Sequence, residues 1–291
     1  MLGKKVINQD LTNKEMGRGT FLIELLFNEK VVMPTEKEIE VVLSKRFGDI
    51  DCVTYGQESA SYATKEYMAE FEDGNVPVML TIISGDITDE FELEPVTLSQ
   101  MWECPDSEDI LKNCKYHVAG VDMLGSGIQD YKKRAHLLCE YAEALVELFP
   151  TCTAILFRSS GKMYTKDDFI RINVPEDVRF IKYAVNVRFF NIEGTDDMIV
   201  DTLGMGALYL PDLQYHFHDM DPNWVVNHAY NVCTYNYENN APIESGETID
   251  GIVDGRMDRN LQWKCQYEDA LVQPVRMVMD INMGDNASGG R

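Results

Sequence analysis

Two histidines, His216 and His218, flank Phe217 in the last third of the chain. Side chains two residues apart on an extended segment point to the same side, so this pair could hold a metal ion. Asp219 and His228 follow closely and could complete the set of ligands. On this interpretation the protein is a metal-dependent hydrolase.

The competing interpretation of these histidines is structural. Zinc enzymes combine several ligands at fixed spacing, as in HExxH, and that motif is absent from the chain. His216 and His218 would then be polar residues on the approach to a helix, with His228 on the flank of that helix beside Trp224. We favour this interpretation and expect no cofactor.

Two glycines, Gly204 and Gly206, interrupt the apolar segment TLGMGAL. A dinucleotide-binding fingerprint would need a third glycine and a helix next, but Leu208-Tyr209-Leu210-Pro211 follows instead. We interpret both glycines and Pro211 as requirements of backbone geometry and close packing. GxxxxGK[ST] and GxSxG are also missing, so the sequence favours a protein that is not an enzyme.

The residues that would position His228 indicate a helix. Asp221 can accept a hydrogen bond from a free backbone N–H at the helix start, and Pro222 suits the first helical position. Strands are expected around this helix at residues 198–210, with a turn in between, at 248–253, and at 263–281 with an interruption at Pro274. The apolar face of the helix comprises Trp224, Val225, Ala229, Val232 and Cys233.

The first half of the chain alternates between strand and helix patterns. Thr35 and Glu38 form a capping box, so a helix begins there and ends at Gly48. Apolar residues at steps of three and four predict a longer helix over residues 130–149. Strands are predicted at residues 20–27, 50–55, 62–71, 76–84, 116–124, 153–159 and 180–190.

These elements predict an α+β fold of mostly antiparallel sheets, each covered by a long helix. Two or three related strand-helix-strand units are one interpretation of the spacing. Pro175 lies in the best boundary segment. We therefore expect an N-terminal α+β region at residues 1–175, a C-terminal α+β domain at 176–282, and a disordered Gly-rich tail at 283–291.

The charge balance is strongly acidic, with 49 Asp and Glu against 26 Lys and Arg and a net charge of −23. Such a chain repels polyanions, and we find no basic stripe that could neutralise phosphates, so nucleic acid is not an expected partner. The acidity fits either a solvated surface or a face that binds a basic protein.

In residues 1–19 no apolar core follows Lys4 and Lys5, so we expect no secretory signal. The longest apolar run, residues 76–83, is far shorter than the roughly 20 residues of a membrane helix. Seven scattered cysteines without a CxxC motif are typical of reduced thiols. We expect a cytoplasmic protein with no membrane partner.

A series of short motifs in residues 188–252 matches a known family pattern. They are Arg188-Phe189-Phe190, Asp201-Thr202-Leu203-Gly204-Met205, Leu208-Tyr209-Leu210-Pro211-Asp212-Leu213, the Asp221-Pro222 helix and the turn Gly246-Glu247-Thr248-Ile249. With these motifs, the segment resembles the bacterial domain-of-unknown-function family 4261. This resemblance implies a small α+β domain in a cytosolic bacterial protein and implies no catalytic residues. Gly204 and Pro211 belong to the family pattern, whereas His216 and His218 do not stand out in it.

Our first expectation is therefore a non-catalytic protein that binds another protein through an acidic surface, in an immunity-like or adaptor-like role. One alternative is the metal-dependent hydrolase built on His216, His218 and Asp219. Another is a small-molecule binding protein with a pocket between sheet and helices. The sequence leaves the identity of the partner and the oligomeric state open.

Overall fold

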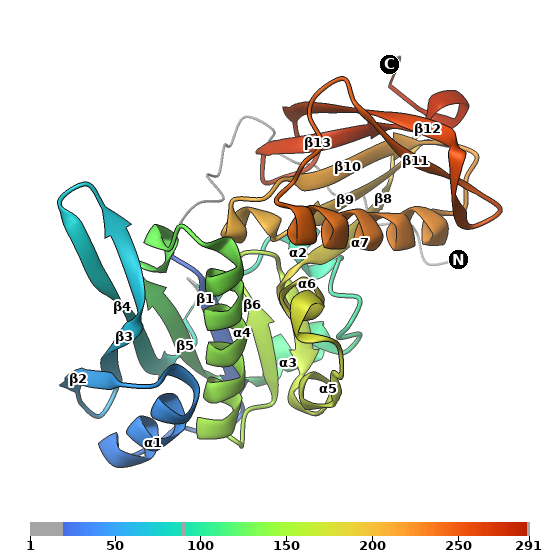
Figure 1. The fold of residues 1–291 in the computed structure, drawn as a ribbon. Coiled ribbons are helices and arrows are strands. Elements are labelled where there is room, and N and C mark those ends of the chain that lie inside the picture. Colours follow the sequence, from blue (N-terminus) through green and yellow to red (C-terminus); the bar gives the residue numbers. More distant parts are fainter. Residues whose placement is uncertain (1–19, 89–90, 290–291) are drawn as a thin grey trace. The chain divides into compact units, whose positions relative to one another are not determined.

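The computed structural model describes residues 20–88 and 91–289 (Figure 1). Contacts between Cα atoms divide them into an N-terminal unit that ends at Ala184 and a C-terminal unit that begins at Val185. Both units combine helices with mostly antiparallel sheets, so the predicted α+β class is confirmed. The residues at the start of the chain, on which the expectation of no signal rests, lie outside the described part.

The N-terminal unit contains a seven-stranded sheet in the order β2-β3-β4-β5-β1-β6-β7, with every neighbouring pair antiparallel. Figure 1 shows α4 lying along this sheet. The strands are β1 (Leu22–Phe27), β2 (Ile50–Tyr55), β3 (Ser59–Phe71), β4 (Gly74–Asp86), β5 (Tyr116–Met123), β6 (Ala154–Phe157) and β7 (Lys162–Thr165). The helices are α1 (Glu36–Phe47), α2 (Pro95–Leu98), α3 (Ser107–Asn113), α4 (Tyr131–Leu148), α5 (Lys166–Arg171) and α6 (Arg179–Ala184).

Local capping sets the start of the main helices, and the capping box predicted at Thr35 and Glu38 is confirmed. Thr35 accepts from the backbone N–H of Glu38, and the Glu38 carboxylate accepts from the backbone of Thr35. Asp130 accepts from the backbone N–H groups of Lys132 and Lys133 at the start of α4. The sequence thus determines these helix starts through hydrogen bonds within one turn.

The strand predicted at residues 180–190 is wrong in its first half, where α6 precedes β8 (Asn186–Asn191). Arg179 and Tyr183 lie one helical turn apart, and both contact the Glu143 carboxylate of α4 at 3.0 Å. Helical spacing is what lets both residues reach one partner. Because these contacts attach α6 to the N-terminal unit, the division falls after Ala184 rather than after residue 175.

The C-terminal unit contains a six-stranded sheet in the order β11-β12-β13-β10-β9-β8. Only the β10–β13 pair is parallel among these strands. Helix α7 (Pro222–Asn239) packs on β8, β9, β10 and β11 (Figure 1). The remaining strands are β9 (Met198–Leu203), β10 (Asp212–Phe217), β11 (Thr248–Val253), β12 (Arg256–Asp269) and β13 (Met277–Asn282).

The segment that we expected to be a disordered tail is ordered as far as the structure describes it. A 3-10 turn forms at Gly284–Asn286. The N–H of His218 donates to the carbonyl of Asn286, and the N–H of Ser288 donates to the carbonyl of His216, each at 2.9 Å. These backbone hydrogen bonds attach the segment to the end of β10; residues 290 and 291 lie outside the described range.

The part of the chain that the structure describes has no helix that is long and apolar enough to cross a membrane.

Candidate functional site

The predicted metal ligands lie around β10, whose side chains alternate between the two faces of the sheet. Tyr215 contacts His228 of α7, so it faces the helix. Its neighbours Gln214 and His216 therefore lie on the opposite face. The alternation of β10 thus separates His216 from His228.

His228 is a buried, neutral imidazole. Its Nε2–H donates to the carbonyl of Asp250 at 2.8 Å, so its Nδ1 accepts from the Tyr215 hydroxyl at 2.9 Å. The ring also contacts Trp263, with 5.1 Å between the ring centroids. Burial lowers the pKa of His228, against a smaller opposing effect of Asp250. Both ring nitrogens serve the packing of α7 on the sheet.

His216 and His218 instead join a polar cluster with the C-terminal segment. The Nε2 of His216 lies 3.6 Å from the Asp197 carboxylate. The Ser288 hydroxyl donates to Asp197 at 2.8 Å, so it accepts from Nδ1 of His218 at 3.0 Å. The Nε2 of His218 lies 3.9 Å from Asp219. Each of these two histidines thus lies near a different carboxylate, His216 near Asp197 and His218 near Asp219.

Within residues 20–88 and 91–289, no group of three or more His, Cys, Asp or Glu side chains is arranged to hold a metal ion. The four predicted ligands His216, His218, Asp219 and His228 are thus not assembled into one site.

Three loops meet where β8, β10 and β13 end, and we call them the acidic end. They comprise residues 192–197, 218–221 and 284–286. The Asn286 amide donates to the carbonyls of His218 and Asp219, and Ser288 donates to Asp197. No Lys or Arg occurs in these loops. Their acidic residues are Glu193, Asp196, Asp197, Asp219, Asp221 and Asp285.

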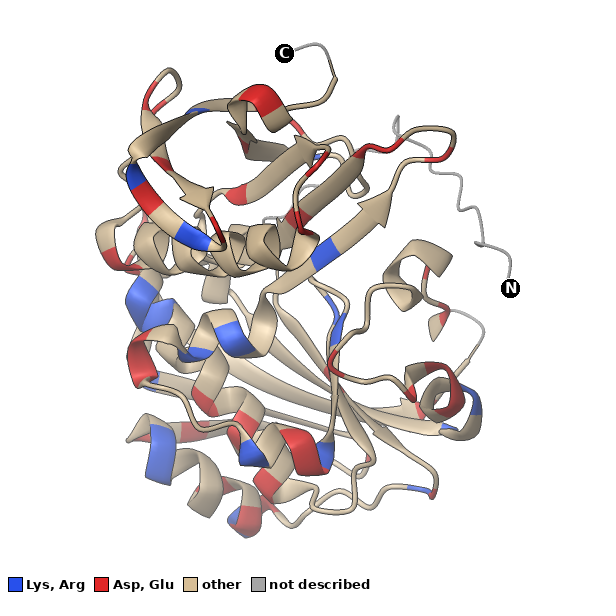
Figure 2. Ribbon diagram, turned by 90° about the vertical axis from the view of Figure 1, so that its right-hand side faces the viewer, with Lys and Arg blue, Asp and Glu red and all other residues tan. Residues whose placement is uncertain are grey.

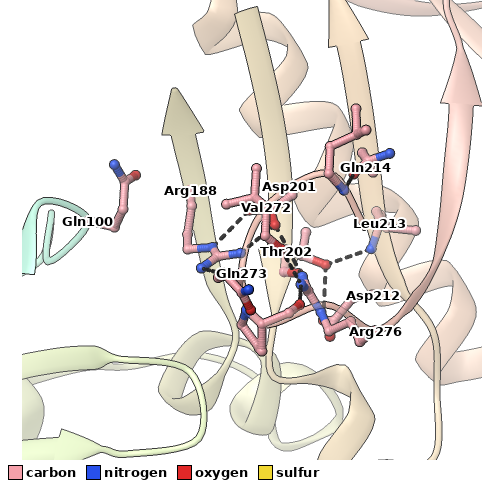
Figure 3. A network of polar contacts seen from close by, with 12 residues as sticks. Gln100, Arg188, Asp201, Thr202, Asp212, Leu213, Gln214, Val272, Gln273 and Arg276 are labelled. Carbon is pink, nitrogen blue, oxygen red and sulfur yellow. Dashed lines mark hydrogen bonds and ion pairs between the residues drawn. The ribbon is translucent and has the colours of Figure 1, made fainter. Parts of the chain in front are cut away.

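A second polar cluster lies on the sheet face opposite α7, and Figure 3 shows its side chains pointing toward one another. Arg188 on β8 pairs with Asp201 on β9 through two hydrogen bonds of 2.8 and 2.5 Å. The strand register continues this row through Gln214 on β10 and Asp280 on β13. The Gln214 amide donates to Asp280 at 3.0 Å. All four residues are buried.

Arg276 joins this cluster from the loop before β13 (Figure 3). Its Nη2 lies 3.1 Å from Asp201 and also donates to the carbonyl of Thr202, while its Nε lies 3.0 Å from Asp212. The buried Arg188 and the largely buried Arg276 thus face two buried aspartates, which compensates their charges. We call Arg188, Asp201, Asp212 and Arg276 the buried ion network.

The buried ion network also holds the turn that carries the predicted glycines. Asp212 accepts from the backbone N–H of Met205 at 3.1 Å and from the Thr202 hydroxyl at 3.2 Å. Gly204 has φ 135°, a conformation that side chains disfavour. Gly206 lies in the 3-10 turn Met205–Leu208, and Pro211 directly precedes β10. These positions serve backbone geometry.

The sequence analysis missed the buried ion network. Arg188 lies between Val187 and Phe189, and Asp201 follows Val200. These charges among apolar strand residues were the available signal, because an ionised residue is buried only when it is paired. Burial raises the pKa of Asp212, and Arg276 opposes that effect. Every member has partners within the unit, so the network is suited to holding the fold together rather than to chemistry.

A hollow of about 650 Å³ in the N-terminal unit bears on the small-molecule alternative, since ligand pockets are of this size. Its charged residues are mixed, with Lys30 against Glu58 and Asp86. It is lined by Lys30, Val31, Val32, Met33, Tyr55, Gly56, Gln57, Glu58, Ser84, Gly85, Asp86 and Tyr116. This lining does not single out one class of ligand.

A family model described as Domain of unknown function (DUF4261) matches residues 201–282. The match begins within β9 and ends with β13, so it contains Asp201, Asp212 and Arg276 but not Arg188. The predicted resemblance to this family is confirmed, although the match starts after residue 188 and extends beyond residue 252. No curated protein and no solved structure matches the chain.

Proposed function

We propose that this chain, which carries the matched domain of unknown function in its C-terminal unit, binds a basic partner protein and catalyses no reaction. The acidic end is the proposed contact surface, in an immunity-like or adaptor-like role. The observation that carries this proposal is the gathering of six carboxylates on three hydrogen-bonded loops without a Lys or Arg. Such a surface attracts a basic protein.

The distribution of the basic residues supports the same proposal. Among residues 185–289, Arg188 and Arg276 lie in the buried ion network, where their charges are compensated. The other three, Arg256, Arg259 and Lys264, all lie on β12. Figure 2 shows the acidic and basic residues along the ribbon. The three loops of the acidic end thus contain no Lys or Arg themselves, and Lys264 of β12 lies opposite Asn282 at the end of β13.

A capture experiment with matched variants tests the proposal. Tagged protein is incubated with host lysate, alongside a variant of the acidic end with Glu193→Gln, Asp196→Asn, Asp219→Asn and Asp285→Asn. Asn suits position 219, whose φ is 52°. The control changes four exposed N-terminal residues, Glu29→Gln, Glu70→Gln, Glu72→Gln and Asp73→Asn, which form no ion pair with another described residue.

We expect the wild type and the control to retain the same basic protein, and the acidic-end variant to lose it. Retention should also fall when salt is raised to about 0.5 M, because exposed charges are then screened. If no protein is retained, or if the acidic-end variant retains it as well as the control does, the proposal is wrong.

We also propose that the protein acts in the bacterial cytoplasm, in keeping with the resemblance. All seven cysteines are free thiols, and six of them are buried. This is the form expected in a reducing compartment. Fractionation of the host would check the proposal, and recovery of the protein outside the cytoplasmic fraction would contradict it.

A further proposal is that a long helix covers each sheet, α4 in the N-terminal unit and α7 in the C-terminal unit, and that the two units share a strand succession in which α1 and α7 take the same place. In the N-terminal unit β1, α1, β2, β3 and β4 follow one another, and the C-terminal unit has the same succession in β10, α7, β11, β12 and β13. The strand orders differ in two ways: β5 lies between β4 and β1, whereas β13 directly neighbours β10, and the strands beyond β1 follow it in the chain, whereas those beyond β10 precede it. This shared succession supports a repeat.

A further inference from the structure

We propose that a hollow beside Trp102 in the N-terminal unit binds an arginine side chain of the basic partner. The inference rests on the proposed function, since it assumes a basic partner, and it adds a second contact with a stated chemistry. The hollow has a volume of about 440 Å³ and lies between α2 and α3. It is lined by Leu98, Ser99, Met101, Trp102, Pro105, Asp106, Ser107, Glu108 and Asp109.

Trp102 is the unusual residue of this hollow, because 56% of its surface is exposed. The indole Nε1–H donates to the Gln100 side chain at 3.2 Å. Gln100 in turn donates to the Ser99 hydroxyl, which donates to the carbonyl of Val96. An exposed tryptophan that is held in place by hydrogen bonds is the residue type that dominates binding energy at protein interfaces.

The charged residues that line this hollow are all negative. Asp106, Glu108 and Asp109 line the hollow, and no Lys or Arg does. None of these three carboxylates forms an ion pair with a described Lys, Arg or His. Glu108 and Asp109 lie in the first turn of α3, where the helix dipole favours negative charge. This interaction stabilises the helix but does not supply a positively charged partner. Their charge therefore remains available to a ligand.

Tryptophan and carboxylates together select a guanidinium group. A cation over the indole face is attracted by the ring electrons, and the planar guanidinium also stacks on the ring. Its fork of N–H donors can bind a carboxylate through two hydrogen bonds, which a lysine ammonium cannot do. An anion would be repelled by the three carboxylates. Arginine is thus the side chain that uses both features.

The test follows the indole N–H resonances of the full-length protein while a blocked tri-arginine peptide is added. The chain has three tryptophans, and Trp102→Ala identifies the resonance of Trp102. Trp263, which is only 1% exposed in the C-terminal unit, supplies the reference resonance. We expect the Trp102 resonance to shift with saturation and the Trp263 resonance to shift less. Tri-lysine should bind roughly five- to tenfold more weakly at Trp102.

Charge variants provide a measurement that leaves Trp102 in place. The variant Asp106→Asn/Glu108→Gln/Asp109→Asn should weaken tri-arginine binding at Trp102 by roughly tenfold, since it removes the carboxylate partners. The matched control Glu70→Gln/Glu72→Gln/Asp73→Asn removes the same charge elsewhere in the unit and should change the affinity less than about twofold. Equal effects of the two variants would overturn the inference, as would equal binding of tri-arginine and tri-lysine.

The two proposals can fail separately. The acidic-end variant should leave the shift of the Trp102 resonance unchanged, because its substitutions lie in the other unit. If tri-arginine does not move the Trp102 resonance while the host partner is still captured, the inference about Trp102 is wrong and the proposed function stands. If Trp102 binds arginine but no basic protein is captured, the proposed function is wrong.

Discussion

His228 is the predicted metal ligand whose role the structure defines most closely. Its two nitrogens are used by Tyr215 and by the carbonyl of Asp250, and burial lowers its pKa. The folded state therefore prefers the neutral ring. An unfolded histidine gains a proton near pH 6.5, so the unfolded state gains stability as the pH falls below about 6.5.

This linkage predicts that the free energy of unfolding declines between about pH 7 and about pH 5, in part because of His228. His228→Gln keeps a donor and an acceptor but cannot be protonated, so its decline should be shallower than that of the wild type. Urea unfolding at a series of pH values measures both slopes. Identical slopes would mean that His228 is not held neutral.

Asp201 is the residue on which the buried ion network depends, because it contacts both Arg188 and Arg276. Asp201→Ala would leave the buried Arg188 and the largely buried Arg276 without this partner, and we expect it to lower the free energy of unfolding by about 3–5 kcal/mol. The control Asp196→Ala lies on the exposed β8–β9 loop and should change it by no more than about 0.5 kcal/mol. A similar effect of both substitutions in urea unfolding would contradict this account.

At the scale of residues, the sequence indicated which types are present but not which of them meet. Asp201 and Asp212 were visible as members of a family pattern in residues 188–252, and Arg276 lay outside that pattern. Their pairing depends on the order of β8, β9, β10 and β13 in the sheet. Strand order is a tertiary property, so a single sequence did not reveal the network or the separation of His228 from His216.

At the scale of elements, prediction succeeded where the signal is local. The capping box at Thr35 and the Asp221-Pro222 helix start depend on hydrogen bonds within one turn. Prediction was wrong at residues 180–184, where alternating residue types fit a strand as well as a helix. The helix is favoured there because Arg179 and Tyr183 both contact Glu143, a residue of another helix.

The segment after β13 yields a prediction at this scale. Ser288 links His218 to Asp197, so Ser288→Ala should loosen the attachment of residues 284–288 to β10. We expect faster hydrogen exchange at the backbone N–H groups of His218 and Ser288, which pair the two segments. The N–H of Leu213, in the same strand but bonded to Thr202, is the internal control. Unchanged exchange at His218 would show that Ser288 does not hold the segment.

At the scale of the whole molecule, the sequence supplied the net charge of −23 but not its distribution. The acidic end combines residues from three loops that are far apart in the chain. The parallel pairing of β10 with β13 is what makes residues 218–221 and 284–286 follow strands that end on the same side. The charged surface proposed here is therefore a consequence of topology.

The most direct test of this account is the salt dependence of partner capture by the wild type, the acidic-end variant and the four-residue control. We predict that one basic protein is retained by the wild type and the control at low salt and released at about 0.5 M salt. The acidic-end variant should retain little of it at any salt. Retention by the acidic-end variant that equals retention by the control would contradict the account.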